Sequence, residues 1–218
     1  MVSTAVSMYK GESPEPAADG YNRISAVVAL TLLEVIKVYD RPSEFFEEED
    51  TSITMPRRLG LSDVVEVQIQ NYKGETKRNR KISDEEFINL VHLVIKRPDS
   101  KSLFFECGRR LANRNKDFWL QFFPRRIASP IAHWRAARQL RLLFGREIGF
   151  FTDVGFDMDG DELLFINSDP SGNACALISG FCSAILSSTM QDQIALDHIT
   201  CKTRGDSLCR WGFPEKVK

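Results

Sequence analysis

Three potential metal ligands lie close together near the carboxyl end of the sequence: His198, Cys201 and Cys209. Thiolate and imidazole are the donors that Zn²⁺ prefers, and structural zinc sites usually take four such ligands in a tetrahedron. Two residues separate His198 from Cys201, and Cys209 follows a turn signal at residues 204–206. A hairpin across that turn returns Cys209 to the side of Cys201. The spacing therefore predicts that one hairpin supplies three ligands to a single ion.

The fourth ligand has to be one of the remaining thiols: Cys107, Cys175 or Cys182. Cys175 and Cys182 share a predicted helix over 175–190, where a rise of about 1.5 Å per residue separates their Cα atoms by roughly 10.5 Å. Both cannot bind one ion comfortably. Cys175 opens the helix, where the helix dipole favours a thiolate, whereas Cys182 lies among apolar residues. We therefore predict a structural Zn²⁺ held by Cys175, His198, Cys201 and Cys209; the alternative is chance proximity of buried cysteines.

The composition narrows the class of protein. The chain has 218 residues, 43% of them hydrophobic, and a formal net charge of −1, so it is not a polycation that binds nucleic acid directly. Its five cysteines are an odd number, which argues against a disulfide framework. The apolar run at 24–36 is too short for a membrane span, which needs about 20 residues, and begins too late for a secretory signal. We expect a cytoplasmic protein without a membrane span.

The amino-terminal half is predicted to contain a mobile arm and a small elaboration. Residues 1–22 are polar and form the arm, and residues 23–98 form the elaboration. A helix is expected at 24–39, and the alternation in VVEVQIQNY (64–72) predicts a half-buried strand. The basic segment 73–81 is expected to form a turn region. Ser83 and Glu86 predict a capping box at the start of the next helix.

The carboxyl-terminal part, 99–218, is predicted to form a helix-rich domain with an antiparallel sheet. Helical patterns at about 100–122 and 130–145 are separated by Pro124 and Pro130. A hairpin is expected about Asp159-Gly160, between strands in 148–158 and 162–167. The helix at 175–190 and the last hairpin follow. The sum predicts the α+β class, with several helices packed on an antiparallel sheet.

The interval pattern Cys175-x22-His198-x2-Cys201-x7-Cys209 resembles the zinc site of the 4-vinyl-reductase domain. That domain is the sensor module of phenol-responsive bacterial transcription activators, which carry Cys, Glu, Cys and Cys at these intervals. The runs CALISGF (175–181) and GDSLCRW (205–211) are similar as well. The resemblance covers about residues 100–213. His198 departs from the pattern by standing in place of the glutamate, which lowers the negative charge of the ligand set without removing a ligand.

The resemblance implies a fold related to the NO-signalling and Golgi-transport ligand-binding domains. It also implies a homodimer that senses a small apolar or aromatic molecule and acts through a downstream protein partner. The resembling sensors enclose an apolar cavity between the helices and the sheet, and a His and a Trp orient the ligand inside it. The corresponding candidates for a ligand pocket here are Phe104, Trp119, Phe122, His133 and Trp134.

Two other functions remain as alternatives. One is an accessory or carrier protein for a tetrapyrrole intermediate, since the family is named for a proposed role in reducing a vinyl group of chlorophyll precursors. The other is a protein-interaction module, because the same fold resembles subunits of vesicle-tethering complexes. Autonomous reductase activity is not expected, since the sequence has no dinucleotide fingerprint, flavin motif or Cys-x-x-Cys pair.

Three further features could carry chemistry. The DMDGDE run (157–162) lacks the order of an EF-hand and predicts a polar turn. Cys107, in an apolar setting, is interpreted as a packing residue and not as a nucleophile. A basic stripe on the helix at 130–145 and the basic segment 73–81 are interpreted as solvated faces or interface ion pairs, with phosphate or nucleic-acid binding as the alternative. The arginines of the stripe and its flanks are Arg125, Arg126, Arg135, Arg138, Arg141 and Arg146.

Overall fold

The computed structural model describes residues 23–40, 62–114, 124–152, 155–158, 168–190 and 194–213. Across these ranges the chain forms six α-helices and two antiparallel sheets, which confirms the predicted α+β class. The predicted arm at 1–22 lies outside the described residues, as do Trp119, Phe122 and the Asp159-Gly160 turn. The helices are α1 (Ala26–Tyr39), α3 (Ser62–Lys77), α4 (Asp84–Ile95), α5 (Ser100–Asn113), α6 (Arg125–Phe144) and α8 (Ala176–Met190).

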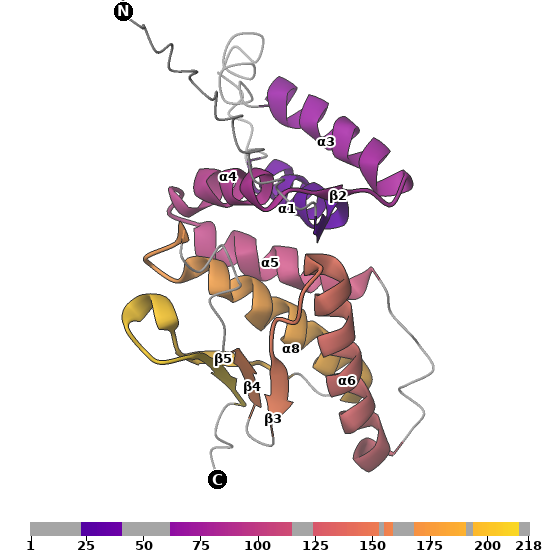
Figure 1. Cartoon of the computed structure of the whole chain (residues 1–218), viewed down its shortest axis with the longest axis vertical. Coiled ribbons are helices and arrows are strands. Elements are labelled where there is room, and N and C mark those ends of the chain that lie inside the picture. The colour runs from indigo at the N-terminus through magenta and orange to yellow at the C-terminus, as the bar shows by residue number, and fades with distance from the viewer. Residues whose placement is uncertain are drawn as a thin grey trace, which may run out of the picture.

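The larger sheet has four strands in the order β3-β4-β6-β5 and covers one side of α8 (Figure 1). Helix α5 packs on the other side of α8, and α1, α3 and α4 lie beyond α5 (Figure 1). The strands are β3 (Phe150–Thr152), β4 (Gly155–Met158), β5 (Asp197–Thr200) and β6 (Cys209–Gly212). Because β5 and β6 pair as neighbours, the predicted last hairpin is confirmed.

Local signals in the sequence account for two helix starts. The Ser83 hydroxyl accepts a hydrogen bond from the backbone N–H of Glu86 at 3.1 Å, as the predicted capping box requires for its serine half. The apolar stripe of α4 is buried at Phe87, Val91 and Val94. Ser25, the second residue of strand β1 (Ile24–Ser25), caps α1 by accepting a hydrogen bond from the backbone N–H of Val27. Strand β1 pairs with β2 (Lys81–Ile82).

The prediction of a strand at 64–72 is wrong, because these residues belong to helix α3. Ile69 and Tyr72 are buried and Val65 packs against the core, and these positions are spaced by four and three residues, as on one face of a helix. Val67, which the strand pattern places on the apolar face with Val65 and Ile69, is instead exposed. The first part of the predicted turn region, 73–77, continues the same helix.

Two predicted boundaries in the carboxyl-terminal part are also corrected. Helix α6 begins at Arg125, and Pro130 lies inside it and not before it. A proline near the start of a helix removes one backbone hydrogen bond, and the helix here tolerates that loss. The segment 148–158, expected to be a single strand, is itself a hairpin in which Phe151 of β3 pairs with Phe156 of β4.

Two glycines set the close crossing of α5 and α8. A Cβ added to Gly180 would lie 2.0 Å from the carbonyl oxygen of Phe105, and one added to Gly108 would lie 2.0 Å from that of Leu177. Only residues without a side chain allow the two backbones to approach so closely. The crossing fixes the start of α8, and with it Cys175, against the rest of the fold.

One hydrophobic cluster joins all six described helices to the larger sheet. Its largest fully buried side chains include Trp211 of β6, Phe181 of α8 and Phe104 of α5. The segment 23–98 therefore shares its core with the segment that follows it. Within the described ranges, the helices are too short or too polar to cross a membrane.

Candidate metal centre

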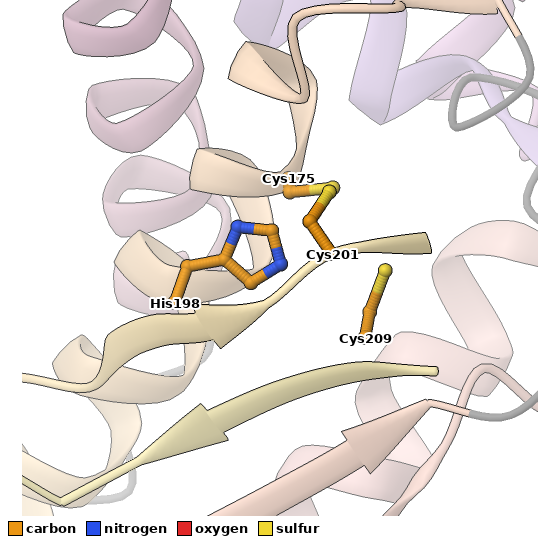
Figure 2. Close-up of side chains that lie close together, drawn as sticks. All are labelled: Cys175, His198, Cys201 and Cys209. Carbon is orange, nitrogen blue, oxygen red and sulfur yellow. The ribbon is translucent and has the colours of Figure 1, made fainter. Parts of the chain in front are cut away.

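Four side chains from three parts of the chain converge beside the start of α8 (Figure 2). Cys175 ends the short 3₁₀ turn η2 (Asn173–Cys175), His198 lies on β5, Cys201 follows β5, and Cys209 opens β6. Their candidate ligand atoms all lie within 4.8 Å of one another. These are the four residues that the sequence predicted as ligands, and the structure brings them together at a site that can bind a metal ion.

The turn that presents Cys175 is held by a buried carboxylate. Asp169 is 1% exposed, and its oxygens accept hydrogen bonds from the backbone N–H groups of Ser171 at 3.0 Å and Ala174 at 2.6 Å. Gly172 has a φ of +71°, and a Cβ there would lie 2.9 Å from the sulfur of Cys201. Glycine is therefore needed both for the backbone conformation and for the space beside the cluster.

The hairpin aims its ligands by breaking the regular strand pattern. In a regular strand, residues 198 and 201 would face opposite sides of the sheet, because side chains alternate. The pairing of β5 with β6 shifts register between His198 and Thr200. This irregularity interrupts the alternation, so the side chains of residues 198 and 201 can face the same side of the sheet. Beyond it, the carboxylate of Asp206 accepts a hydrogen bond from the backbone N–H of Cys201 at 2.7 Å. Gly205, with a φ of +98°, ends the short turn η3 (Lys202–Arg204) before β6 begins.

The cluster is buried and polar. The three cysteines are at most 1% exposed. The sulfur of Cys209 accepts a hydrogen bond from the backbone N–H of Lys202 at 3.3 Å, and the sulfur of Cys201 lies 2.9 Å from the hydroxyl of Thr203. The pKa of Cys209 is lowered, chiefly because Cys175 donates a hydrogen bond to its sulfur, and the same bond raises the pKa of Cys175. One member of the cluster is therefore already stabilised as a thiolate, the form that binds metal.

The imidazole of His198 is fixed by stacking. Its ring lies 4.7 Å from that of Trp211, at 16° between planes, and the two residues face each other across β5 and β6. Its Nε2 is buried and has no hydrogen-bond partner in the described part of the chain. A buried polar atom without a partner is costly. Coordination of an ion is one way to satisfy it.

The four donors and their spacing fit a metal ion that is coordinated tetrahedrally by three thiolates and one imidazole. Zinc–sulfur bonds of about 2.3 Å in a tetrahedron place two sulfurs about 3.8 Å apart. The sulfurs of Cys175 and Cys201 are 3.9 Å apart. Cys182 is also buried, but it is not part of the cluster, as predicted from its position in the middle of the helix. Four protein ligands would leave no position for substrate, so an ion here would link the β5–β6 hairpin to the start of α8.

Arg210, one of the cations near the hairpin, does not face the cluster. Its guanidinium forms hydrogen bonds of 2.8 and 2.9 Å with both oxygens of Asp157, directly across the β4–β6 pair. The pairing fixes the register of β4 on β6.

The residues predicted to form an aromatic ligand pocket are dispersed where they are described. Phe104 is buried in the core, His133 is half-buried with its ring stacked on Phe151 at 4.4 Å, and Trp134 is 61% exposed. The small cavity that Trp134 lines includes neither Phe104 nor His133. Since Trp119 and Phe122 lie outside the described residues, the complete pocket remains a prediction.

A cavity of about 640 Å³ adjoins the metal cluster. His198, Gly172 and Arg204 form part of its wall, and Tyr39 and Phe105 contribute aromatic rings. The polar groups that line it include Lys101, Glu106, Asn173, Ser179 and Asp197. The sequence did not predict this cavity. Its walls come from the end of α1, from α5 and α8, and from the loops around the cluster, and no local pattern links them.

Cys107, considered above as a nucleophile, is fully buried on α5. Burial raises the pKa of its thiol to about 12. It therefore stays protonated near neutral pH and serves as a packing residue at the α5–α8 crossing.

Comparison of the chain with protein-family models, with curated proteins and with solved structures found no match. The fold and the site define an α+β protein with a buried Cys₃His cluster that could bind a metal ion, beside a cavity.

Proposed function

We propose that this protein is a sensor domain that binds a small aromatic molecule and is held together by a structural Zn²⁺. The observation that carries the proposal is the shared wall: His198 belongs both to the metal cluster and to the lining of the 640 Å³ cavity. An ion that fixes the imidazole would thereby fix one side of the ligand site. The resemblance to sensors with a 4-vinyl-reductase domain supports the same assignment, including a homodimer and an output through a partner protein.

The lining supports a ligand with one aromatic face and one acidic or hydroxyl group. The side chains of Tyr39 and Phe105 are 42% and 39% exposed, so both leave aromatic surface uncovered by the rest of the described chain. Lys101 and Arg204 bring positive charge to the same cavity, and Ser179 brings a hydroxyl. Ligand sites commonly combine apolar walls with a few polar groups that orient the ligand. A phenol or an aromatic acid meets both requirements.

The acidic groups of the cavity favour a small ligand over a large polyanion. Glu106 is ionised at neutral pH, because the Arg109 guanidinium that donates a hydrogen bond to it holds its pKa below the usual value. Asp197 of β5 lines the same cavity. A ligand with several negative charges would meet repulsion from both carboxylates.

Calorimetric titration of the zinc-loaded full chain with phenol and 4-hydroxybenzoate tests the proposal. We expect saturable binding that is lost in Ser102→Trp, since Ser102 is an exposed residue of the cavity wall and a large side chain there fills the opening. The matched control is Gln68→Trp, at an exposed position on α3 that does not line the cavity. Absence of binding, or equal binding by both variants, would contradict the proposal.

A further inference from the structure

Two basic segments that the candidate metal centre does not use meet at the carboxyl end of α5. Arg138 and Arg141 of α6 line a second cavity, of about 920 Å³, together with Lys81 from the basic segment 73–81 and Arg114 at the end of α5. Among the described residues that line this cavity there is no aspartate or glutamate. We propose that this cavity, the basic groove, binds the phosphate or diphosphate group of a small organic ligand.

Two of the four cations are not committed to a carboxylate. Within the described ranges, Lys81 and Arg138 form no ion pair, and the Arg138 guanidinium is instead held over the ring of Trp134, 5.2 Å from its centroid. In this contact the guanidinium group of Arg138 stays charged, and its N–H groups remain available to a ligand. Guanidinium groups are suited to phosphate because they present paired donors.

The other two cations are paired with acids outside the groove lining. Arg114 contacts Glu34 at 2.9 Å, with both side chains about one-third exposed. Arg141 contacts Glu147 at 3.4 Å, where the side chains are 66% and 82% exposed. Exposed pairs of this kind contribute little energy and exchange partners easily. A phosphate in the groove can therefore compete for both guanidinium groups.

The start of α1 adds a second, independent source of positive potential. Ser25 caps this 14-residue helix, its first turn carries no acidic residue, and both Ser25 and Val27 line the groove. The backbone N–H groups of Ala26 and Val27 already donate to the Arg80 carbonyl and the Ser25 hydroxyl, so what α1 adds is the positive partial charge of its amino end, which favours phosphate. The amino end of α1 and the four cations therefore both contribute positive potential to the basic groove.

Close packing places these groups together. Gly145, which ends α6 and lines the groove, has a φ of +69°, and a Cβ there would lie 2.4 Å from the carbonyl oxygen of Arg23. The end of α6 therefore lies directly against the strand that leads into α1. In Figure 1 the upper end of α6 reaches the region between α5 and β2.

The groove also has an apolar wall. Leu111 of α5, and Leu142 and Leu143 of α6, line it, and Leu142 is 64% exposed. An inorganic phosphate would leave this wall in water. A phosphorylated molecule with an apolar or aromatic body would cover it, and burial of that surface would add to the affinity. The inferred ligand is therefore an organic phosphate.

Calorimetric titration of the zinc-loaded full chain with inorganic pyrophosphate, ADP and farnesyl diphosphate tests the inference. We expect pyrophosphate to bind and to weaken as salt is raised, because the attraction is screened. At least one organic diphosphate should bind more tightly than pyrophosphate, and the comparison between the two separates a nucleoside body from an isoprenoid body. Lys81→Gln and Arg138→Gln should each reduce affinity about tenfold, since each removes a donor to a charged group.

Lys96→Gln is the matched control, because Lys96 is an exposed lysine at the end of α4 that does not line the groove. It should leave all three affinities unchanged. The inference is overturned if none of the diphosphates binds, or if the Lys81→Gln/Arg138→Gln double variant, folded by circular dichroism, binds them as the unaltered chain does. Binding of a DNA duplex without binding of any diphosphate would also overturn it.

Discussion

At the residue scale, the two cysteines of the α8 region have different environments despite their similar burial. Cys175 lies 3.9 Å, sulfur to sulfur, from Cys201, at the polar start of the helix. Cys182 lies two turns further on, where burial raises the pKa of its thiol and, among the residues that the structure describes, no group of candidate ligands includes it. Burial alone therefore does not identify a metal ligand. Convergence with other donors does.

This difference predicts the metal content of two matched variants. Cys175→Ala removes one of four ligands, and apparent zinc affinity should fall on the order of a hundredfold or more, since about 10–16 kcal/mol of binding energy is shared among four ligands. Cys182→Ala should keep one zinc per chain at unchanged affinity. Competition with a chromophoric chelator measures both. Equal loss in the two variants would mean that the cluster is not the metal centre.

The convergence of the four candidate ligands could be predicted from the sequence because most of the information for it is local. The intervals between His198, Cys201 and Cys209 lie within one hairpin, and helix geometry alone separates Cys175 from Cys182. The cavity beside the cluster could not be predicted, because Tyr39 and Phe105 reach it from helices whose packing no local pattern specifies.

At the scale of elements, the crossing of α5 and α8 depends on two glycines. Gly180→Ala should destabilise the protein by about 1–3 kcal/mol, because its Cβ would overlap the Phe105 carbonyl and force the helices apart. Gly74→Ala is the matched control, since Gly74 lies in α3 with no atom within 4 Å of the added Cβ. It should instead stabilise by about 0.5–1 kcal/mol, the usual gain for alanine in a helix.

Urea denaturation followed by circular dichroism measures both changes in the free energy of unfolding. The opposite signs are the critical feature, because they separate the steric effect at the crossing from the general helix preference of alanine. If both variants gained stability, the close approach of α5 to α8 would not be required for the fold.

Elements with a unique signal were predicted correctly, and those with an ambiguous signal were not. The cap at Ser83 specifies a helix start, and α4 begins there. The segment 64–72 alternates at period two, but Val65, Ile69 and Tyr72 also fit one helical face, and the core offered by α1 selects that face. Tertiary packing decides such cases, and it is absent from a local pattern.

At the scale of the whole molecule, charge is unevenly distributed. The formal net charge is only −1, yet four cations gather in one groove without a carboxylate in its described lining. The candidate metal centre lies elsewhere, at the junction of α8 with the β5–β6 hairpin. The single hydrophobic cluster joins the two regions, so the two proposed binding sites share one core.

Metal removal should therefore act locally first. A ligand present at about 1,000 times its Kd stabilises the folded state by about 4 kcal/mol. For a chain of this size that energy corresponds to a fall in Tm of about 10 °C when a chelator removes the ion. Hydrogen exchange should rise in η2, β5 and β6, which the ion links. It should change little in α3 and α4, which hold the remote side of the core in place through Ile69, Tyr72 and Phe87.

The Cys175→Ala variant serves as the control for this experiment, because it already lacks the link between helix and hairpin. Its Tm and exchange pattern should lie closer to those of the chelated protein and should respond less to further chelator than those of the unaltered chain. Lys202 and the residues up to Cys209 form the loop between two ligands, so their amides should report the loss of the ion first. Uniform exchange throughout the fold after chelation would show that the ion supports the whole core, and would contradict a role confined to the hairpin.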